Sequence, residues 1–207
     1  MRRHIPNLLT ASRFFMAIAF FIILGFYDPG REAGWPILDV AFAVFLVGVC
    51  TDMVDGYLAR RLGHMTTFGR IADPFVDKII VCGALVYFVG DQFWTYPGGG
   101  ASPVNATGWH TWMVVLILSR ELLVTGMRSF SESHGVGFGA TWSGKVKMIL
   151  QCTAISWSLV WVALWTDGPA WTQVARDVLV WGATLFTGLS GRVYVKRAYH
   201  ILRLPPD

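Results

Sequence analysis

Four aspartates stand close together in a chain that is otherwise strongly apolar. They form two pairs, whose members lie three and four residues apart: Asp52 with Asp55, and Asp73 with Asp77. Residues at these spacings share one face of an α-helix. Long apolar segments flank the acidic stretch on both sides. Because a carboxylate beside lipid is costly unless it is compensated, the stretch predicts two helices that present carboxylates to bound cations at a membrane surface.

The composition is typical of a membrane protein. Of the 207 residues, 54% are hydrophobic and 14% are charged, whereas soluble domains carry about 25% charged residues. The three cysteines stand singly inside apolar runs, at Cys50, Cys82 and Cys152. An odd number without paired spacing argues against a disulfide framework or a zinc site. The net charge of +4 is modest, and no nucleic-acid partner is expected.

Six apolar segments are candidates for membrane spans, each of which needs roughly 20 residues. We predict them at residues 8–27, 36–60, 69–90, 109–130, 144–165 and 171–195, within a single domain that covers residues 1–207. Residues 61–67 form a short basic loop, and residues 91–108 form a long loop without a basic residue. Asn105-Ala106-Thr107 in that long loop matches a glycosylation sequon, which we interpret as a chance match.

The positive charges predict the orientation of these spans. Of the 17 lysines and arginines, 15 fall toward the side of the two termini, and only Arg31 and Arg176 fall toward the other. Positive residues mark the cytoplasmic side. We therefore expect an all-α integral protein of the cell (inner) membrane, with about six transmembrane helices and with both termini and the acidic stretch facing the cytoplasm. An aromatic belt is expected at the opposite face, formed by Trp35, Trp94, Trp109, Trp165 and Trp171.

The residues around the aspartates suit a phosphate-bearing ligand. Carboxylate oxygens prefer hard cations such as magnesium, manganese or calcium, and two such ions are able to clamp a phosphoryl group. Gly56, Ala59 and Gly69 leave room beside the acids, while Arg60 offers a planar fork for phosphate oxygens and Thr66 offers a hydroxyl. The physical prediction is a site for a pyrophosphate-bearing lipid, although isolated aspartates at a helix end also act as caps.

The acidic stretch resembles the signature of the CDP-alcohol phosphatidyltransferase family. Every defined position of that signature is matched by Asp52-x2-Asp55-Gly56-x2-Ala59-Arg60-x8-Gly69-x3-Asp73-x3-Asp77. The resemblance extends over most of the chain. Three further segments are similar to the branch that makes phosphatidylglycerophosphate: Ile5-Pro6-Asn7-Leu8-Leu9-Thr10-x2-Arg13, Ser119-Arg120-Glu121-Leu122 and Trp142-Ser143-Gly144-Lys145-Val146-Lys147.

The resemblance implies a reaction and a homodimer. The donor would be CDP-diacylglycerol with its acyl chains in the membrane lipid, the hydroxyl of glycerol 3-phosphate would attack the lipid-linked phosphorus, and CMP would leave. Two Mg²⁺ or Mn²⁺ ions would be ligated by Asp52, Asp55, Asp73 and Asp77, and Asp77 would also take the hydroxyl proton. The CDP-lipid site would be lined by Asn7, Thr10, Asp52, Gly56, Ala59, Arg60, Thr66 and Gly69.

The phosphate of the acceptor needs a separate cationic pocket. Its candidates are Arg120, Arg128, Lys145 and Lys147. Arg120 and Arg128 lie about 80° apart around a helix and are able to converge on one anion. The same side chains are also suited to snorkelling toward the membrane surface. Glu121 is expected to pair with one of these cations rather than to act as a catalyst.

Several alternatives stay open. A membrane prenyltransferase also binds a diphosphate through aspartates, but it is normally longer and has two acidic motifs far apart in sequence. A cation transporter would carry its carboxylates near the middle of the membrane, and a non-catalytic relative would only bind lipid. Within the family, inositol phosphate and phosphatidylglycerol are the other acceptors. Activity with a CDP-lipid but not with a prenyl diphosphate would exclude the prenyltransferase. Ion flux in the absence of a CDP-lipid would favour the cation transporter.

Overall fold

The computed structural model describes residues 5–29, 37–62, 67–96, 103–133, 142–165 and 168–202. Six long helices account for most of these residues: α1 (Ile5–Gly25), α2 (Ile37–Leu62), α3 (Thr67–Phe88), α4 (Thr111–Ser133), α5 (Trp142–Leu164) and α6 (Ala170–Leu202). Each helix overlaps one of the predicted spans. The prediction of an all-α architecture is therefore confirmed.

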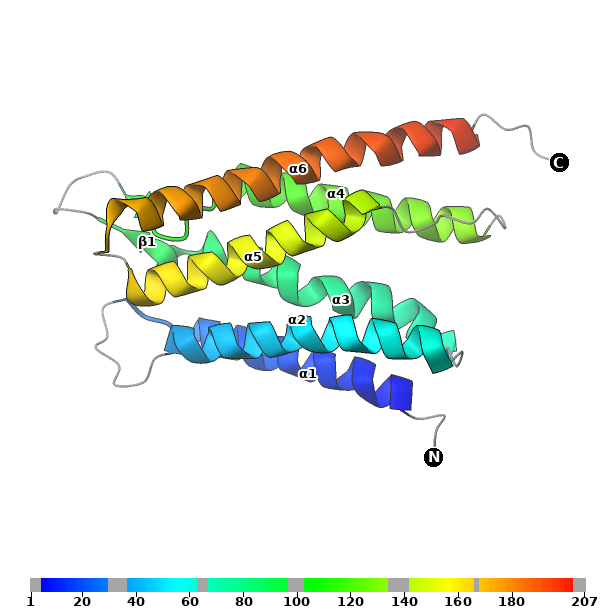
Figure 1. Cartoon of the computed structure of the whole chain (residues 1–207), viewed down its shortest axis with the longest axis horizontal. Helices are drawn as coiled ribbons and strands as arrows, with labels where there is room; N and C mark the ends of the chain where they lie inside the picture. Colours follow the sequence, from blue (N-terminus) through cyan, green and yellow to red (C-terminus); the bar gives the residue numbers. More distant parts are fainter. Residues whose placement is uncertain are drawn as a thin grey trace.

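The helices run back and forth along one long axis (Figure 1). The first residue of α1 and the last residue of α6 lie at the same end of the bundle, which we call the terminal end; α2 also ends there, and α3 begins there. The strand β1 lies at the opposite end, the hairpin end. Helix α1 packs against α2 and α3, α2 packs against α5, and both α4 and α5 pack against α6. The acidic stretch, which spans the end of α2 and the start of α3, is thereby placed at the terminal end.

Helix α6 extends beyond the predicted span. It continues to Leu202, whereas the predicted span stops at residue 195. The span was bounded at that residue because the apolar run stops there. Lysine, arginine and alanine are themselves good helix formers, so the helix continues beyond the apolar run.

Close packing fixes α3 against α1. A side chain at Gly83 would collide with Phe21, because a Cβ atom built there would lie 2.1 Å from the phenyl ring. The missing side chain lets Phe21 of α1 lie directly on the α3 backbone, and Phe21 also stacks on Tyr87 with ring centroids 5.7 Å apart. This contact packs α3, the helix that carries Asp73 and Asp77, closely against α1.

Large apolar side chains also cover the outside of the bundle. Phe15, Leu122 and Trp142 are 67%, 73% and 80% exposed, respectively. Extensive exposed apolar surface marks contact with a membrane or with another protein. Within the described residues, α5 alone is long and apolar enough to cross a bilayer by itself, and Ala11–Gly25, Ile37–Thr51 and Lys78–Phe88 are shorter apolar stretches. The count of six spans stays a prediction.

Residues 91–95 and 104–105, between α3 and α4, are folded, although the sequence predicted only a loop there. It contains a 3₁₀ turn, η1 (Asp91–Phe93), and two short antiparallel strands, β1 (Trp94–Thr95) and β2 (Val104–Asn105). Phe93 is fully buried, stacks on Tyr27 with ring centroids 5.0 Å apart, and meets Phe88 edge-on. The hairpin therefore packs against the ends of α1 and α3.

Asn105 gives the apparent sequon a structural role. Its Nδ2 donates to the carbonyl of Phe88, the last residue of α3, at 2.8 Å, and its Oδ1 accepts from the backbone N–H and the hydroxyl of Thr107. The Thr107 hydroxyl also lies 3.1 Å from the Phe88 carbonyl. The last carbonyls of a helix have no partner within the helix. Asn105 and Thr107 satisfy one of them from the hairpin.

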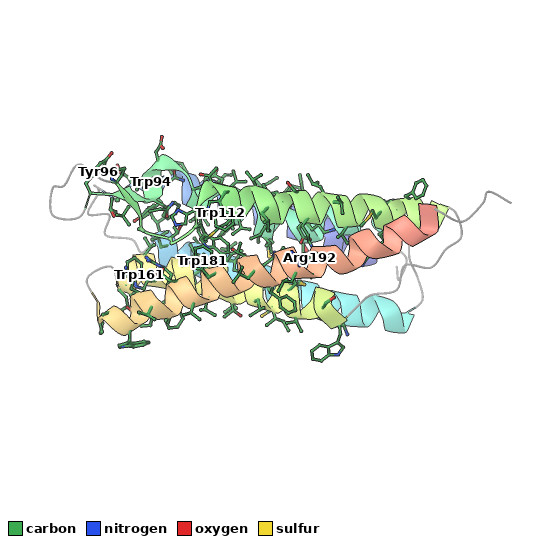
Figure 2. All side chains as sticks on the ribbon, turned by 90° about the horizontal axis from the view of Figure 1, so that it is seen from above. Trp94, Tyr96, Trp112, Trp161, Trp181 and Arg192 are labelled. Carbon is green, nitrogen blue, oxygen red and sulfur yellow. The ribbon has the colours of Figure 1, made fainter. Side chains whose placement is uncertain are left out.

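Arg176 is buried at the hairpin end rather than free in solution. Its Nη1 donates to the Ala106 carbonyl at 2.6 Å, its Nη2 lies 2.8 Å from Asp177, and its guanidinium lies 4.1 Å from the Trp161 ring centroid. Figure 2 shows Trp161 at the same end of the bundle as Trp94, with Arg192 toward the other end. Arg176, one of the two cations predicted on the side opposite the termini, is thus neutralised by its ion pair with Asp177.

The predicted aromatic belt needs one correction. Trp109 is fully buried and donates its ring N–H to Ser158 at 3.2 Å, so it is a core residue that ties the start of α4 to α5. Trp165 and Trp171 are near neighbours, with ring centroids 6.1 Å apart, and Trp171 is exposed. Trp35 lies outside the described residues.

Replacing Asn105 by alanine is expected to destabilise the fold. The change leaves the Phe88 carbonyl and the Thr107 N–H without their Asn105 partners, at a cost of about 2 kcal/mol for the buried groups. In a chain of this size, that corresponds to a Tm lower by roughly 4–8 °C. Val104→Ala is the matched control because Val104 is the exposed neighbour on the same strand. Thermal unfolding in detergent measures both variants, and equal Tm values for the two would contradict the role assigned to Asn105.

Candidate active site

The backbone of the acidic stretch is helical on both sides of its loop. Asp52 and Asp55 lie in the last part of α2, and Asp73 and Asp77 lie in the first half of α3. Both segments belong to the terminal end (Figure 1). The structure therefore places each pair on a helix at the spacing that puts its members on one face. The side chains of residues 52–77 lie outside the described residues, and the convergence of the four carboxylates stays a prediction.

The other residues of the predicted CDP-lipid site share this position. Their backbone lies in three helices: Asn7 and Thr10 in α1, Gly56, Ala59 and Arg60 in α2, and Gly69 in α3. Thr66 lies outside the described residues. Among the side chains that the structure describes, His, Cys, Asp and Glu form no group of three or more that is able to hold a metal ion. The acidic stretch therefore stays a predicted donor set for hard cations.

Three helices bring charged side chains together next to this stretch. Glu121 of α4 is the centre: its Oε1 accepts from Lys147 Nζ of α5 at 2.5 Å and from Arg120 Nη1 at 3.1 Å. All three residues are at least nine-tenths buried. The expectation that Glu121 pairs with a cation is confirmed, and it pairs with two. We refer to Lys78, Arg120, Glu121, Thr125 and Lys147 as the charge cluster.

Lys78 joins the charge cluster from α3. Its ammonium donates to the hydroxyl of Thr125, and that hydroxyl donates in turn to the backbone carbonyl of Glu121 at 2.7 Å. From the sequence, Lys78 was only one of the 15 cations on the terminal side, and Thr125 was not a predicted site residue. The available signal was a lysine inside an apolar segment, which marks a functional position by default.

The charge cluster lies beside the acidic stretch. Lys78 directly follows Asp77 in α3, and consecutive Cα atoms are about 3.8 Å apart. The contact of Lys78 with Thr125 therefore brings α4 to the level of the second acidic pair. This adjacency joins the proposed diphosphate site to a set of buried cations.

The other two acceptor candidates, Arg128 and Lys145, are more exposed than Arg120 and Lys147. Arg128, two turns along α4 from Arg120, is half-buried, and its positive charge repels that of Lys78. Lys145 is exposed. Of the two α5 lysines, Lys147 is thus the one inside the charge cluster.

Helix α6 supports the charge cluster from behind. A Cβ atom at Gly191 would lie 3.3 Å from Arg120 Cγ, so the bare backbone of α6 makes room for the Arg120 stem. One turn along α5 from Lys147, Gln151 donates to the Thr187 hydroxyl of α6 at 3.1 Å. These two contacts fix α4 and α5 against the same face of α6.

Comparisons with known proteins identify the family of this chain. The family model of the CDP-alcohol phosphatidyltransferases matches residues 3–189. A CDP-diacylglycerol–glycerol-3-phosphate 3-phosphatidyltransferase of Bacillus subtilis is 33% identical over 209 residues, which cover 97% of each chain. An Escherichia coli protein of the same name is 31% identical, with 87% of this chain and 91% of the relative covered. A Mycobacterium tuberculosis protein named "Probable phosphatidylglycerophosphate synthase" is 35% identical, with 94% of this chain and 81% of the relative covered.

The fold, the motif and the relatives define one class of protein, the helical membrane enzymes that use a CDP-activated alcohol. The chain belongs to the CDP-alcohol phosphatidyltransferase family. The family resemblance inferred from the acidic signature is confirmed. This family consists of membrane proteins that generally use divalent metals, which agrees with the exposed apolar surface and with the four aspartates.

Proposed function

We propose that this chain transfers the phosphatidyl group of CDP-diacylglycerol to glycerol 3-phosphate, which yields phosphatidylglycerophosphate and CMP. The observation that carries the proposal is the adjacency of Asp77 and Lys78 in α3. Asp77 belongs to the family signature, whose aspartates would hold the metal ions, and Lys78 belongs to the charge cluster. A metal-held diphosphate and an anionic acceptor would meet at that point. The names of the Bacillus subtilis and Escherichia coli relatives support the same donor and acceptor.

The donor would bind at the acidic stretch. Four carboxylates in two helical pairs fit hard divalent cations such as Mg²⁺ or Mn²⁺, and two ions match four acidic ligands and a diphosphate. When bound, these ions would supply charge neutralisation for the diphosphate. Asp52, Asp55, Asp73 and Asp77 would hold them, and the small residues Gly56, Ala59 and Gly69 would leave room for the nucleotide. Arg60 and Thr66 would contact its phosphates, and Asn7 and Thr10 would reach it from α1.

The acceptor would bind at the charge cluster. Its phosphate carries a charge of about −1.5 to −2 at neutral pH, and buried Arg120 and Lys147 are cationic donors beside the reaction centre. Arg128 and Lys145 complete the predicted set. Asp77, one residue from Lys78, would take the proton of the attacking hydroxyl, because a carboxylate within reach of the acceptor is suited to general-base catalysis. The phosphorus–oxygen bond to CMP breaks as the bond to the glycerol oxygen forms.

The setting of the enzyme is part of the proposal. The chain would form one domain over residues 1–207 with six membrane spans in the cell (inner) membrane. Both termini and the active site would face the cytoplasm, because the lysines and arginines gather at the terminal end. The family resemblance suggests a homodimer.

The proposal is tested with an acceptor panel. Purified full-length protein, reconstituted with CDP-diacylglycerol and Mg²⁺, is expected to release CMP in a saturable manner with glycerol 3-phosphate. Release with inositol phosphate or phosphatidylglycerol is expected to be at least about 100-fold less efficient, since a pocket built for one polar ligand discriminates strongly. CMP release that prefers either of the other acceptors, or turnover of a prenyl diphosphate in place of CDP-diacylglycerol, would contradict the assignment.

A further inference from the structure

We propose that Glu121 is a positioning residue for the phosphate of the acceptor, and this inference rests on the proposed function. Glu121 would not touch the reacting atoms. It would hold Arg120 and Lys147 converged and buried, so that the acceptor phosphate meets two cations already in place. The proposal gives a role in acceptor affinity to an acidic residue inside a pocket for an anion.

The geometry singles out one oxygen atom. Lys147 Nζ lies 2.5 Å and Arg120 Nη1 lies 3.1 Å from the same Glu121 Oε1. The two cationic nitrogens therefore lie within about 5.6 Å of each other, the sum of these two distances. The three side chains are at most 10% exposed, so water screens their mutual repulsion only weakly. The shared carboxylate oxygen opposes that repulsion directly.

Thr125 links the third cation to Glu121. Its hydroxyl donates to the Glu121 carbonyl and accepts from Lys78. Arg120 and Lys147 thus contact the Glu121 carboxylate, while Lys78 reaches the Glu121 backbone only through Thr125. Their three positive charges and the single carboxylate leave a net charge of two, which matches a phosphomonoester dianion.

Removal of the carboxylate would have two opposite effects on an anion. The site would gain one positive charge, which by itself favours any anion. It would also lose the anchor of Lys147, whose ammonium, on a long flexible stem, has no other hydrogen-bond partner among the residues that the structure describes. Because crowded, weakly screened cations repel one another, we expect them to separate. The loss of convergence then outweighs the gain in charge, and acceptor binding weakens.

A double-mutant cycle tests this inference in the full-length protein. CMP release is measured against glycerol 3-phosphate concentration for the wild type, Glu121→Gln, Lys147→Met and the double variant. Glu121→Gln alone is expected to raise the KM for glycerol 3-phosphate by about tenfold, with kcat and the KM for CDP-diacylglycerol changed less than about threefold. In the Lys147→Met background, the same change is expected to leave that KM unaltered or to lower it, because residues in contact act non-additively.

Two controls keep the outcome interpretable. Asp91→Asn removes an exposed carboxylate at the hairpin end and is expected to leave both KM values unchanged. Glu121→Asp keeps the charge but shortens the side chain, and it is expected to give an intermediate KM; this variant replaces Glu121→Gln if the latter fails to fold by thermal unfolding. A KM for glycerol 3-phosphate that stays at the wild-type value in every folded Glu121 variant would overturn the positioning role.

The result also separates this inference from the proposed function. If the wild type releases no CMP in response to glycerol 3-phosphate, the proposed function is wrong. If the wild type responds but Glu121→Gln lowers the KM, Glu121 only competes with the phosphate for the cations. If its effect is the same in both backgrounds, Glu121 does not act through Lys147. Either of the last two results overturns the inference and leaves the proposed function standing.

Discussion

Replacing Asp77 by asparagine is expected to lower kcat for phosphatidyl transfer by about 10³-fold or more, within the range that general-base catalysis contributes. Asparagine has nearly the same shape, but its amide does not take a proton from the acceptor hydroxyl. Three of the four predicted metal ligands remain in the variant. Binding of CDP-diacylglycerol is therefore expected to stay measurable while turnover is lost.

The position of Asp77 distinguishes it from the other three acids. It is the residue next to Lys78, whose ammonium contacts Thr125 of the charge cluster. The acceptor hydroxyl would lie between the charge cluster and the diphosphate. Asp77, the aspartate next to the charge cluster in sequence, would therefore be the best placed of the four to act as the general base. Asp39→Asn is the matched control because Asp39 is an exposed aspartate in the first turn of the neighbouring helix α2. Turnover by Asp77→Asn that equals the turnover of this control would refute the base assignment.

The helices could be predicted because apolar runs of about 20 residues permit few other structures. All six predicted spans overlap helices, and the acidic pairs lie in α2 and α3 as their spacing indicated. Helix α6 continues past the predicted span because apolarity bounds a span but does not end a helix. Residues 196–202 are helical and include good helix formers such as lysine, arginine and alanine.

The folded hairpin between α3 and α4 could not be predicted from local sequence. Its strands are two residues long, and its stability comes from contacts with distant residues. Asn105 bonds the carbonyl of Phe88, and Arg176 reaches the carbonyl of Ala106 across 70 positions of the chain. An asparagine two residues before a threonine carries no sign of such a role. The role of Asn105 depends on the position of the hairpin relative to the end of α3, which the local sequence does not contain.

The charge cluster was predicted in part. Arg120 and Lys147 were named from their motifs, and Glu121 was expected to pair with a cation. The sequence did not reveal that one carboxylate oxygen serves both cations, because the pair belongs to different helices. Nor did it separate Lys145 from Lys147, since a shift of two residues on a helix changes the face by about 200°. The structure places Lys147 in the interior and Lys145 at the surface.

The central claim is that the four aspartates are tolerated beside lipid because they hold divalent cations around the diphosphate of the donor. Its most direct test measures CMP release from CDP-diacylglycerol and glycerol 3-phosphate after metal removal by a chelator, with the residual metal content of the protein determined in parallel. We expect release to fall to the uncatalysed background, because metal ions supply several kcal/mol of transition-state stabilisation in phosphoryl transfer. Mg²⁺ or Mn²⁺ is expected to restore it, and K⁺ is not. Full activity in protein that retains far less than one divalent ion per chain would contradict the claim.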